Sequence, residues 1–296
     1  MATVGLLHPG EMGAAVGGCL VSVRHTVLWD PTGRSRASTG RALAAELTGV
    51  PFDALVPRCS VIFSVCPPHA ALDVARQVAA TGYAGIYVDA NAISVATAEQ
   101  VSAIVTAAGA AYVDGGIIGP PPEIAGHTRI YLSGPRADEV LALFGRSALQ
   151  ARIAEGPLYA ASGLKMAYAA WTKGTGALLL AARALARSEG VERALLAEWA
   201  LSQPALAKQS ERSAESAAAK GWRWVAEMEE IAASMTSAGL PAGFHEAAAD
   251  IYDRAAHAST GPANTEQTGR PSGGGRVRSG ESDPPSTLDT VISALM

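Results

Sequence analysis

Short apolar runs alternate with helix-like segments through the first half of the chain. The segments between the runs carry apolar residues at helical spacing over 12–23, 69–80 and 95–108. Strands that are apolar on both faces and separated by helices are typical of a parallel sheet covered on both sides. The pattern therefore predicts a doubly wound, mostly parallel α/β fold. The predicted strands are residues 3–7, 25–30, 60–68, 85–91, 110–116 and 128–134.

The pattern changes after Gly156 and Pro157, where the chain becomes rich in Ala, Leu, Glu and Arg at helical spacing. It predicts one long helix from about residue 161 to Gly190, which serves as a C-cap. Further helices are predicted at about 191–202 and 221–239, and helical spacing continues to residue 256.

Residues 257–286 are rich in Gly, Ser, Pro and Thr and hold almost no large apolar residues. Such a segment buries too little surface to offset the entropy of ordering, so it is predicted to be disordered. The predicted organisation has four parts. They are an α/β domain (1–156), an all-helical domain (157–256), a disordered linker (257–286) and a short terminal helix (287–296).

Composition excludes several classes of function. The net charge of −4 argues against nucleic acid as a partner, and "GRPSGGGRVR" is interpreted as a flexible tether. Six histidines and three cysteines show no metal-ligand spacing, so no metal is predicted. "MATVGLL" has no basic start, and the apolar stretch "GALLLAARALA" is too short to cross a bilayer. We therefore expect a cytoplasmic protein with no membrane partner.

The stretch "VGLLHPGEMG" has the context of a dinucleotide-binding loop, because a strand precedes it and a helix follows. In the pattern G-x-G-x-x-G the three slots hold His8, Gly10 and Gly13. Gly10 lets the backbone approach a pyrophosphate, and Gly13 lets the helix pack on the strand. Histidine tolerates the positive φ that the first slot requires. The alternative is a glycine-rich turn with no ligand.

The residues after the second strand bear on the choice of cofactor. Asp30 lies 20 residues after Gly10, where a carboxylate accepts hydrogen bonds from a ribose 2′-hydroxyl and favours NAD. Arg34 follows, and its guanidinium group can pair with a 2′-phosphate, with Ser35 as a further donor. NADP is the preferred prediction and NAD is the alternative. The predicted cofactor-binding residues are His8, Pro9, Gly10, Glu11, Met12, Gly13, Asp30, Arg34, Ser35, Cys66, Pro67 and Asn91.

Five stretches, taken in order, resemble the β-hydroxyacid dehydrogenase family, which includes 6-phosphogluconate dehydrogenase and the imine reductases. They are "VGLLHPGEMG", "VIFSVCPP", "VDANAIS", "AYVDGGIIGPP" and "GLKMAYAAWTKG". The likeness is greatest to a subgroup labelled putative phosphogluconate dehydrogenase with an NAD-binding C-terminal domain. It implies a Rossmann domain followed by an all-helical domain that a long helix opens, in a homodimer.

The resemblance also implies that Lys165 is the general acid/base, because family members carry a lysine early in the long helix. Other family positions differ in this sequence. Ala169 stands where an asparagine is common, and Tyr159 and Ala161 replace upstream glycines. The family's Ser-Gly-Gly loop becomes Ile118-Gly119-Pro120, its Asp-x-Ser-Thr turn becomes 89–92, and its Lys-Asp pair becomes Ala226-Glu227.

Lys165 lies in the apolar stretch "SGLKMAYAAW", where desolvation moves the pKa of a lysine toward neutrality. The alternative is a lysine that extends to water at a helix end. Tyr168 and Thr172 share its helix face. Asn91 follows a strand end, where it holds a ligand or forms a turn. The predicted substrate residues are Gly116, Ile117, Tyr168 and Thr172.

These observations predict an NAD(P)-dependent oxidoreductase that acts on a small hydroxyacid or related carbonyl compound. Two alternatives stay open. One is imine reduction on the same scaffold, which the apolar loop at 117–118 favours. The other is a dinucleotide-binding sensor without turnover, which the missing family side chains favour.

Overall fold

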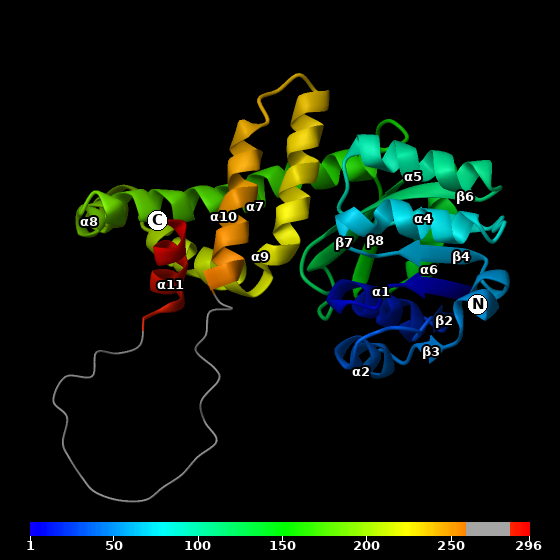
Figure 1. Ribbon diagram of the computed structural model, residues 1–296. Coiled ribbons are helices and arrows are strands. Elements are labelled where there is room, and N and C mark those ends of the chain that lie inside the picture. Colours follow the sequence, from blue (N-terminus) through cyan, green and yellow to red (C-terminus); the bar gives the residue numbers. More distant parts are fainter. Residues whose placement is uncertain (259–284) are drawn as a thin grey trace, which may run out of the picture. The chain divides into compact units, whose positions relative to one another are not determined.

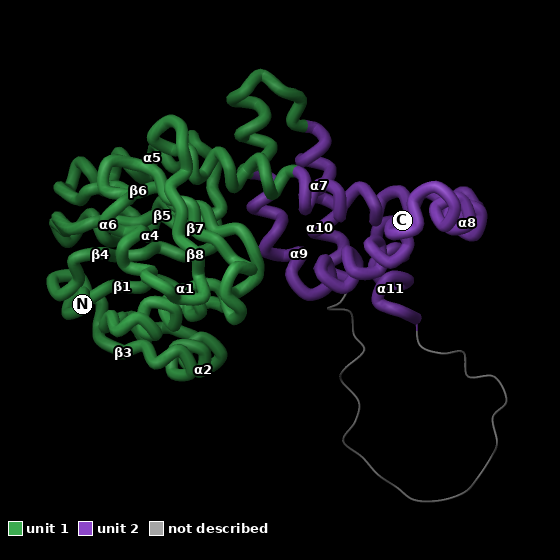
Figure 2. Tube along the Cα trace, turned by 180° about the vertical axis from the view of Figure 1, so that it is seen from behind, with its two compact units in different colours: residues 1–170, 230–242 green, residues 171–229, 243–296 purple. Residues whose placement is uncertain are grey.

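The computed structural model describes residues 1–258 and 285–296 (Figure 1). The chain divides into two compact units (Figure 2). Unit 1 comprises residues 1–170 and 230–242, and unit 2 comprises residues 171–229 and 243–296. The division between units falls within the long helix. The predicted domains and their boundaries stay predictions.

Unit 1 contains an eight-stranded sheet with the order β3-β2-β1-β4-β5-β6-β7-β8. All neighbours pair in parallel except β6 and β7, which are antiparallel. The order 3-2-1-4-5-6 is that of a doubly wound Rossmann sheet, which confirms the predicted fold class. The strands are β1 (Thr3–Leu7), β2 (Thr26–Trp29), β3 (Thr48–Gly49), β4 (Val61–Ser64), β5 (Ile86–Asp89), β6 (Ala111–Ile118), β7 (Thr128–Ser133) and β8 (Leu149–Ile153).

The six strands predicted from apolar runs are all present, and β3 and β8 are additional. Both additional strands lie at the ends of the sheet. The two residues of β3 are exposed, and β8 ("LQARI") buries only Leu149 fully. An edge strand needs no continuous apolar run, so neither gave the pattern that marks the central strands.

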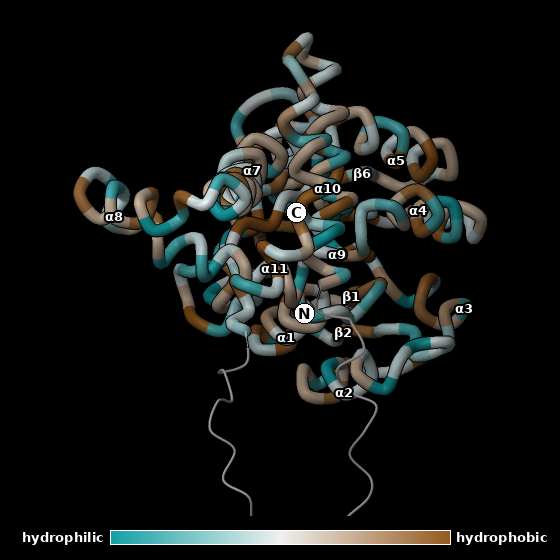
Figure 3. The backbone as a smooth tube through the Cα atoms, turned by 60° about the vertical axis from the view of Figure 1, so that its left-hand side comes forward, coloured by the Kyte–Doolittle hydropathy of each residue, from teal (hydrophilic) through white to brown (hydrophobic). Residues whose placement is uncertain are grey.

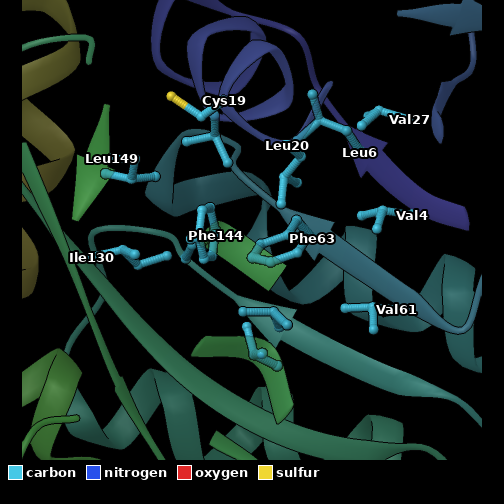
Figure 4. Close-up of a cluster of buried hydrophobic side chains, with 14 of the residues drawn as sticks. Val4, Leu6, Cys19, Leu20, Val27, Val61, Phe63, Ile130, Phe144 and Leu149 are labelled. Atoms are coloured by element: carbon cyan, nitrogen blue, oxygen red, sulfur yellow. The ribbon is translucent and has the colours of Figure 1, made fainter. Parts of the chain in front are cut away.

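Successive residues of the central strands pack into two separate cores, one on each face of the sheet. Val4 and Leu6 lie in the first core, whereas Leu7 lies in the second. The same alternation separates Phe63 from Ile62, as the period of two in a strand requires. Figure 4 shows the first core, where the Phe63 and Phe144 rings pack edge to face with centroids 5.8 Å apart.

Helices cover both faces of this sheet. They are α1 (Glu11–Ser22), α2 (Arg36–Ala44), α3 (Phe52–Leu55), η1 (Val56–Arg58), η2 (Pro68–Ala70), α4 (Ala71–Ala79), α5 (Val95–Ala107) and α6 (Ala137–Phe144). A later segment completes α5: the Glu230 carboxylate accepts a 2.7 Å hydrogen bond from the Ser94 backbone N–H and a 2.9 Å bond from the Thr97 hydroxyl. The start of α5 is therefore capped by its own Ser94 and by a carboxylate from 230–242 of the same unit.

The remaining elements are α7 (Ala160–Ser188), α8 (Glu192–Ser202), α9 (Leu206–Ser237), α10 (Gly243–Ala258) and α11 (Thr287–Leu295). The predicted helix at 221–239 begins 15 residues too late, because α9 starts at Leu206. Gly221, the first residue of the predicted helix, lies inside α9. A Cβ at Gly221 would be 2.7 Å from the Tyr252 carbonyl oxygen, so this glycine permits close packing of α9 against α10.

An ion-pair network in unit 2 joins α7, α8 and α11. Arg183 is 4% exposed and donates to Glu192 at 2.7 Å and to the Ser210 hydroxyl at 2.9 Å. Arg187 bridges Glu192 and Asp289, each at 2.8 Å. The chain forms a terminal helix, α11, where residues 287–296 predict one. This helix packs against α10. Figure 3 colours both helices by hydropathy. In the described parts of the chain, no helix combines the length and apolarity needed to span a bilayer.

The linker predicted at 257–286 falls largely on residues 259–284, which lie outside the described residues. Residues 257–258 belong to α10. Ser286 caps α11 through a reciprocal pair of hydrogen bonds with Asp289.

Candidate functional site

Several predicted site residues follow the carboxyl ends of parallel strands in unit 1. His8 comes after β1, Asp30 after β2, Cys66 after β4 and Asn91 after β5. These four strands are neighbours in the sheet and run in the same direction. Ligands of open α/β sheets bind at this edge, so the strand order brings the predicted cofactor residues to one side of unit 1.

The loop between β1 and α1 has the backbone that the glycine pattern predicts. His8 adopts a φ of 68°, so a histidine does occupy the left-handed slot. A Cβ at Gly13 would lie 2.3 Å from the His8 carbonyl oxygen, so only glycine fits there. A Cβ at Gly10 would meet nothing within 4 Å. The backbone at Gly10 therefore faces open space at the start of α1, where N–H groups of a first turn are available to an anion.

A small cavity beside this loop brings together His8, Asp30 and Arg34. The His8 Nδ1 and Arg34 Nε atoms are buried there and have no hydrogen-bond partner among the described residues. Burial, and then the Arg34 charge, lower the pKa of His8 from 6.5 to about 4, so its imidazole is neutral near pH 7. Buried polar atoms of a native structure are nearly always satisfied, so these two are polar groups beside the loop whose hydrogen bonds are still unmade.

The neighbouring residues have local structural roles as well. The Asp30 carboxylate accepts a 2.9 Å bond from the Thr32 backbone, and Ser35 caps α2 by accepting from the Ser38 backbone at 3.2 Å. Sequence reasoning missed Arg41, whose Nε donates to the Pro9 carbonyl at 3.5 Å. Its place in the second turn of α2, facing back toward the loop, has no signal in the sequence pattern.

Asn91 is held inside the protein rather than directed at solvent. Its Oδ1 accepts a 2.6 Å bond from the Cys66 backbone N–H, and its Nδ2 donates to the Ser64 hydroxyl at 3.1 Å. Asn91 thereby ties the ends of β4 and β5 together and fixes the backbone at Cys66 and Pro67. Burial raises the pKa of the Cys66 thiol to about 12, so this thiol is not a nucleophile near pH 7.

Lys165 lies in the second turn of α7, within the part of the helix that belongs to unit 1. Part of its side chain reaches the surface, but protein atoms make up most of its surroundings. Desolvation lowers its pKa from 10.5 to about 8, and the nearby Tyr168 acts in the opposite direction. Lys165 therefore exists in both protonation states near neutral pH.

The predicted substrate residues occupy different surroundings. A Cβ at Gly116 would lie 2.5 Å from the Ala161 carbonyl oxygen and 3.2 Å from the Lys165 Cβ, so β6 and α7 are in direct contact. Ile117 is 6% exposed and packs in the first core. Tyr168 is 45% exposed and neighbours Lys165. Thr172 belongs to unit 2, and the contact of all four with substrate stays a prediction.

Thr172 lines a cavity of about 180 Å³ within unit 2. Lys173 also lines it and forms an ion pair with the buried Glu227, and its Nζ lies 5.4 Å from the centroid of the Trp224 ring. The Tyr252 hydroxyl donates to the Lys173 carbonyl at 2.6 Å. Sequence reasoning named Thr172 and Glu227 separately but did not bring them together, because the members of the cluster come from α7, α9 and α10.

No group of three or more His, Cys, Asp or Glu side chains suited to a metal ion occurs within residues 1–258 and 285–296. Another cavity of unit 1, of about 620 Å³, lies at the opposite edge of the sheet, before β4 and β5. Its lining includes Cys59 and Tyr83 but none of the predicted site residues.

Residues 186–255 match a family model described as a domain of unknown function, DUF1932. No curated protein matches the sequence. The solved structure of the conserved protein MTH1747, described as similar to 3-hydroxyacid dehydrogenases, is 26% identical. That match covers 86% of this chain and 97% of the other, with a TM-score of 0.63.

Two enzymes of known activity share the fold. The 3-hydroxyisobutyrate dehydrogenase of Mycobacterium tuberculosis is 19% identical over 87% of this chain and 94% of its own, with a TM-score of 0.64. A reductive aminase from Aspergillus terreus, solved with NADPH4, cyclohexanone and allyl amine, is 20% identical. Its match covers 86% of this chain and 94% of its own, with a TM-score of 0.54.

Proposed function

Since the chain belongs to the 3-hydroxyacid dehydrogenase-like family, we propose that it is an NADP-dependent oxidoreductase. The proposed reaction transfers a hydride between the nicotinamide and a small hydroxyacid or related carbonyl compound. The observation that carries the proposal is a lysine amine of near-neutral pKa, Lys165, in the same compact unit as an open glycine loop.

The residues of the β1–α1 loop suit a dinucleotide. The open space at Gly10 and the first-turn amides of α1 accommodate a pyrophosphate, and Gly13 keeps the helix close beneath it. Arg41 steadies the loop through the Pro9 carbonyl. Asn91 supports this edge indirectly, by fixing the backbone at Cys66. When bound, the nicotinamide supplies or accepts the hydride.

Lys165 is proposed as the general acid/base. In oxidation its neutral Nζ takes the proton of the substrate hydroxyl, and in reduction its ammonium returns a proton to the carbonyl oxygen. An acid/base group works best when its pKa lies near the working pH, and burial brings the pKa of Lys165 to about 8.

NADP is preferred to NAD because of the polar atoms around the small cavity. Arg34 contributes a guanidinium with a buried, unsatisfied Nε, and a 2′-phosphate would satisfy and neutralise it. Asp30 opposes this preference through its negative charge. Arg34→Ala is expected to weaken NADP binding about tenfold or more and NAD binding by less than threefold. Titration calorimetry with both coenzymes tests this, and an equal loss of both contradicts it.

The activity is tested with a panel of hydroxyacids, aldehydes and cyclic imines, followed by nicotinamide absorbance. Lys165→Met is expected to lower turnover by about 10²-fold or more. The control is Lys220→Met, which removes an exposed lysine of α9. A dinucleotide-binding sensor would bind coenzyme tightly but turn over no compound of the panel. Failure to bind either coenzyme at millimolar concentration would refute both proposals.

Imine reduction is the second candidate, and a specific observation favours it. Ile118 is 4% exposed and Ala169 is 2% exposed, and both are apolar where the resemblance expects a serine and an asparagine. A substrate site without these polar groups suits a less polar substrate than a hydroxyacid. Turnover of cyclic imines without turnover of hydroxyacids would select this candidate.

We also propose that the chain forms a homodimer. Trp171, Leu178 and Leu185 recur every seven residues on α7 and are 73%, 54% and 63% exposed. A stripe of large apolar side chains at this spacing is typical of helix association. Light scattering after size exclusion is expected to give twice the chain mass, and Leu178→Asp is expected to give monomers. A monomeric wild-type protein contradicts the proposal.

A further inference from the structure

The first turn of α7 is fastened to the sheet by a buried carboxylate. Asp114 of β6 is fully buried. Its Oδ2 accepts a 2.8 Å hydrogen bond from the Ser162 backbone N–H, and its Oδ1 accepts a 2.5 Å bond from the Ser162 hydroxyl. The first N–H groups of a helix have no acceptor within the helix. The sheet therefore supplies the cap that this helix needs.

A second strand extends this network. Ser133 of β7 lies opposite Asp114 in the antiparallel β6–β7 pair. Its hydroxyl donates to Asp114 Oδ2 at 3.0 Å and accepts from the Ala161 backbone N–H at 3.1 Å. The register of the two strands thus sets two hydrogen-bonding side chains under consecutive amides of α7. An anion at a helix N-terminus is further stabilised by the helix dipole.

The fastened turn leads directly to Lys165. Lys165 follows Ser162 by three residues, which is just under one helical turn. Gly116 lies two residues after Asp114 on β6. Because glycine has no side chain, the backbone at Ala161 and the Lys165 Cβ can approach β6 closely. The network and this close approach hold the same turn of α7 from two points.

The titratable groups near Asp114 do not stabilise its buried carboxylate. Asp89 and Tyr112 face it from β5 and β6, and burial raises the pKa of each. Burial also raises the pKa of Asp114, and the Ser162 and Ser133 hydrogen bonds oppose that rise. The nearest compensation for the buried carboxylate is therefore the set of donors at the start of α7.

We propose that Asp114, acting through Ser162 and Ser133, is a positioning residue that holds Lys165 against β6 and limits its contact with water. The inference rests on the proposed function, in which Lys165 moves a proton. Loosening this turn admits water to the amine, which favours its charged form.

The test reads Lys165 directly, without need of turnover. The chain has four lysines, at positions 165, 173, 208 and 220. Lysine labelled with carbon-13 at Cε therefore gives few NMR signals, and the signal lost in Lys165→Met identifies Lys165. In Ser162→Ala and Ser133→Ala, the Lys165 midpoint is expected to rise from about 8 toward 10.5, by about half a pH unit or more.

The matched control is Ser210→Ala in unit 2. It also removes a fully buried serine hydroxyl that is hydrogen-bonded to a charged side chain, Arg183. We expect a comparable loss of stability in urea and no change in the Lys165 midpoint. An unchanged midpoint in both Ser162→Ala and Ser133→Ala overturns the proposal, as does an equal rise in Ser210→Ala.

The outcome is separable from that of the proposed function. With an active substrate, the acidic limb of the kcat/KM profile for alcohol oxidation, where activity rises as Lys165 loses its proton, is expected to move with the Lys165 midpoint. If the midpoint rises but Lys165→Met retains full turnover, the positioning stands and the catalytic assignment of Lys165 fails. If Lys165→Met is inactive and the midpoint is unchanged in both serine variants, the positioning fails alone.

Discussion

Replacing Lys165 by methionine is expected to stabilise the fold at neutral pH while it removes activity. Burial lowers the pKa of this lysine from 10.5 to about 8. One pKa unit corresponds to about 1.4 kcal/mol, so the charged amine costs the folded state about 3 kcal/mol below pH 8. Because part of the side chain reaches the surface, we expect Lys165→Met to gain about 1–3 kcal/mol.

The sign of the pH dependence follows from the two pKa values. Between pH 8 and pH 10.5 the unfolded chain holds its Lys165 proton while the folded chain has lost it. The unfolded state then binds more protons, so the free energy of unfolding of the wild type rises with pH across this window. Below pH 8 both states are protonated and the full cost remains. The advantage of Lys165→Met is therefore largest at pH 7 and shrinks toward pH 10.5.

Urea unfolding of the wild type and of Lys165→Met is measured at pH 7 and at pH 10. The stability advantage of the variant at one pH is then compared with its advantage at the other, so the contributions of other titrating groups cancel. The exposed Lys220→Met variant is the control, expected to stay within about 0.5 kcal/mol of the wild type at both pH values. A Lys165→Met variant that is less stable at pH 7, or whose advantage does not shrink at pH 10, would show that Lys165 is well solvated. The acid/base assignment would then lose its physical basis.

Three further predictions concern the loop, the strand ends and unit 2. Gly13→Ala places a Cβ against the His8 carbonyl and is expected to lower both thermal stability and coenzyme affinity, whereas Gly10→Ala, which meets no protein atom, lowers only the affinity. Titration calorimetry measures the affinity and thermal melts measure the stability. An equal loss of melting temperature in both variants contradicts the proposed role of the β1–α1 loop. Asn91→Ala removes the hydrogen bonds to Cys66 and Ser64 and is expected to cost about 1–3 kcal/mol in urea unfolding; an unchanged midpoint refutes this role. Arg183→Met removes the ion pair with Glu192 and the hydrogen bond to Ser210, and is expected to lower the free energy of unfolding by about 3 kcal/mol in thermal melts. A variant as stable as the wild type would mean that the network contributes little to stability.

The fold was predictable where burial imposes a simple pattern. The central strands lie between two cores, so continuous apolar runs marked them within a few residues. Edge strands such as β8 are half exposed and carry no such run. The helix predicted from residue 221 missed the first part of α9, which begins at Leu206. Gly221 lies inside that helix, where it permits close packing against α10.

The candidate site was predictable in its local parts and not in its long-range ones. His8, Gly10 and Gly13 stand at fixed spacing, and their backbone conformations follow from that spacing. Asp114 was not singled out, although it lies inside the predicted strand at 110–116. A carboxylate inside an otherwise apolar strand was the signal available, but its partners come from β7 and α7, and the pairing exists only once the sheet and the helix are in register.

The hydrogen bonds from Ser94 and Thr97 to Glu230 have a consequence for how the protein is made. A nascent chain that has emerged only as far as β8 already holds every strand of the sheet, yet α5 still lacks the carboxylate that caps it. The Glu230 hydrogen bonds that complete α5 in unit 1 can therefore form only after more than seventy further residues have left the ribosome. A fragment cut after residue 170 would inherit the same deficit permanently.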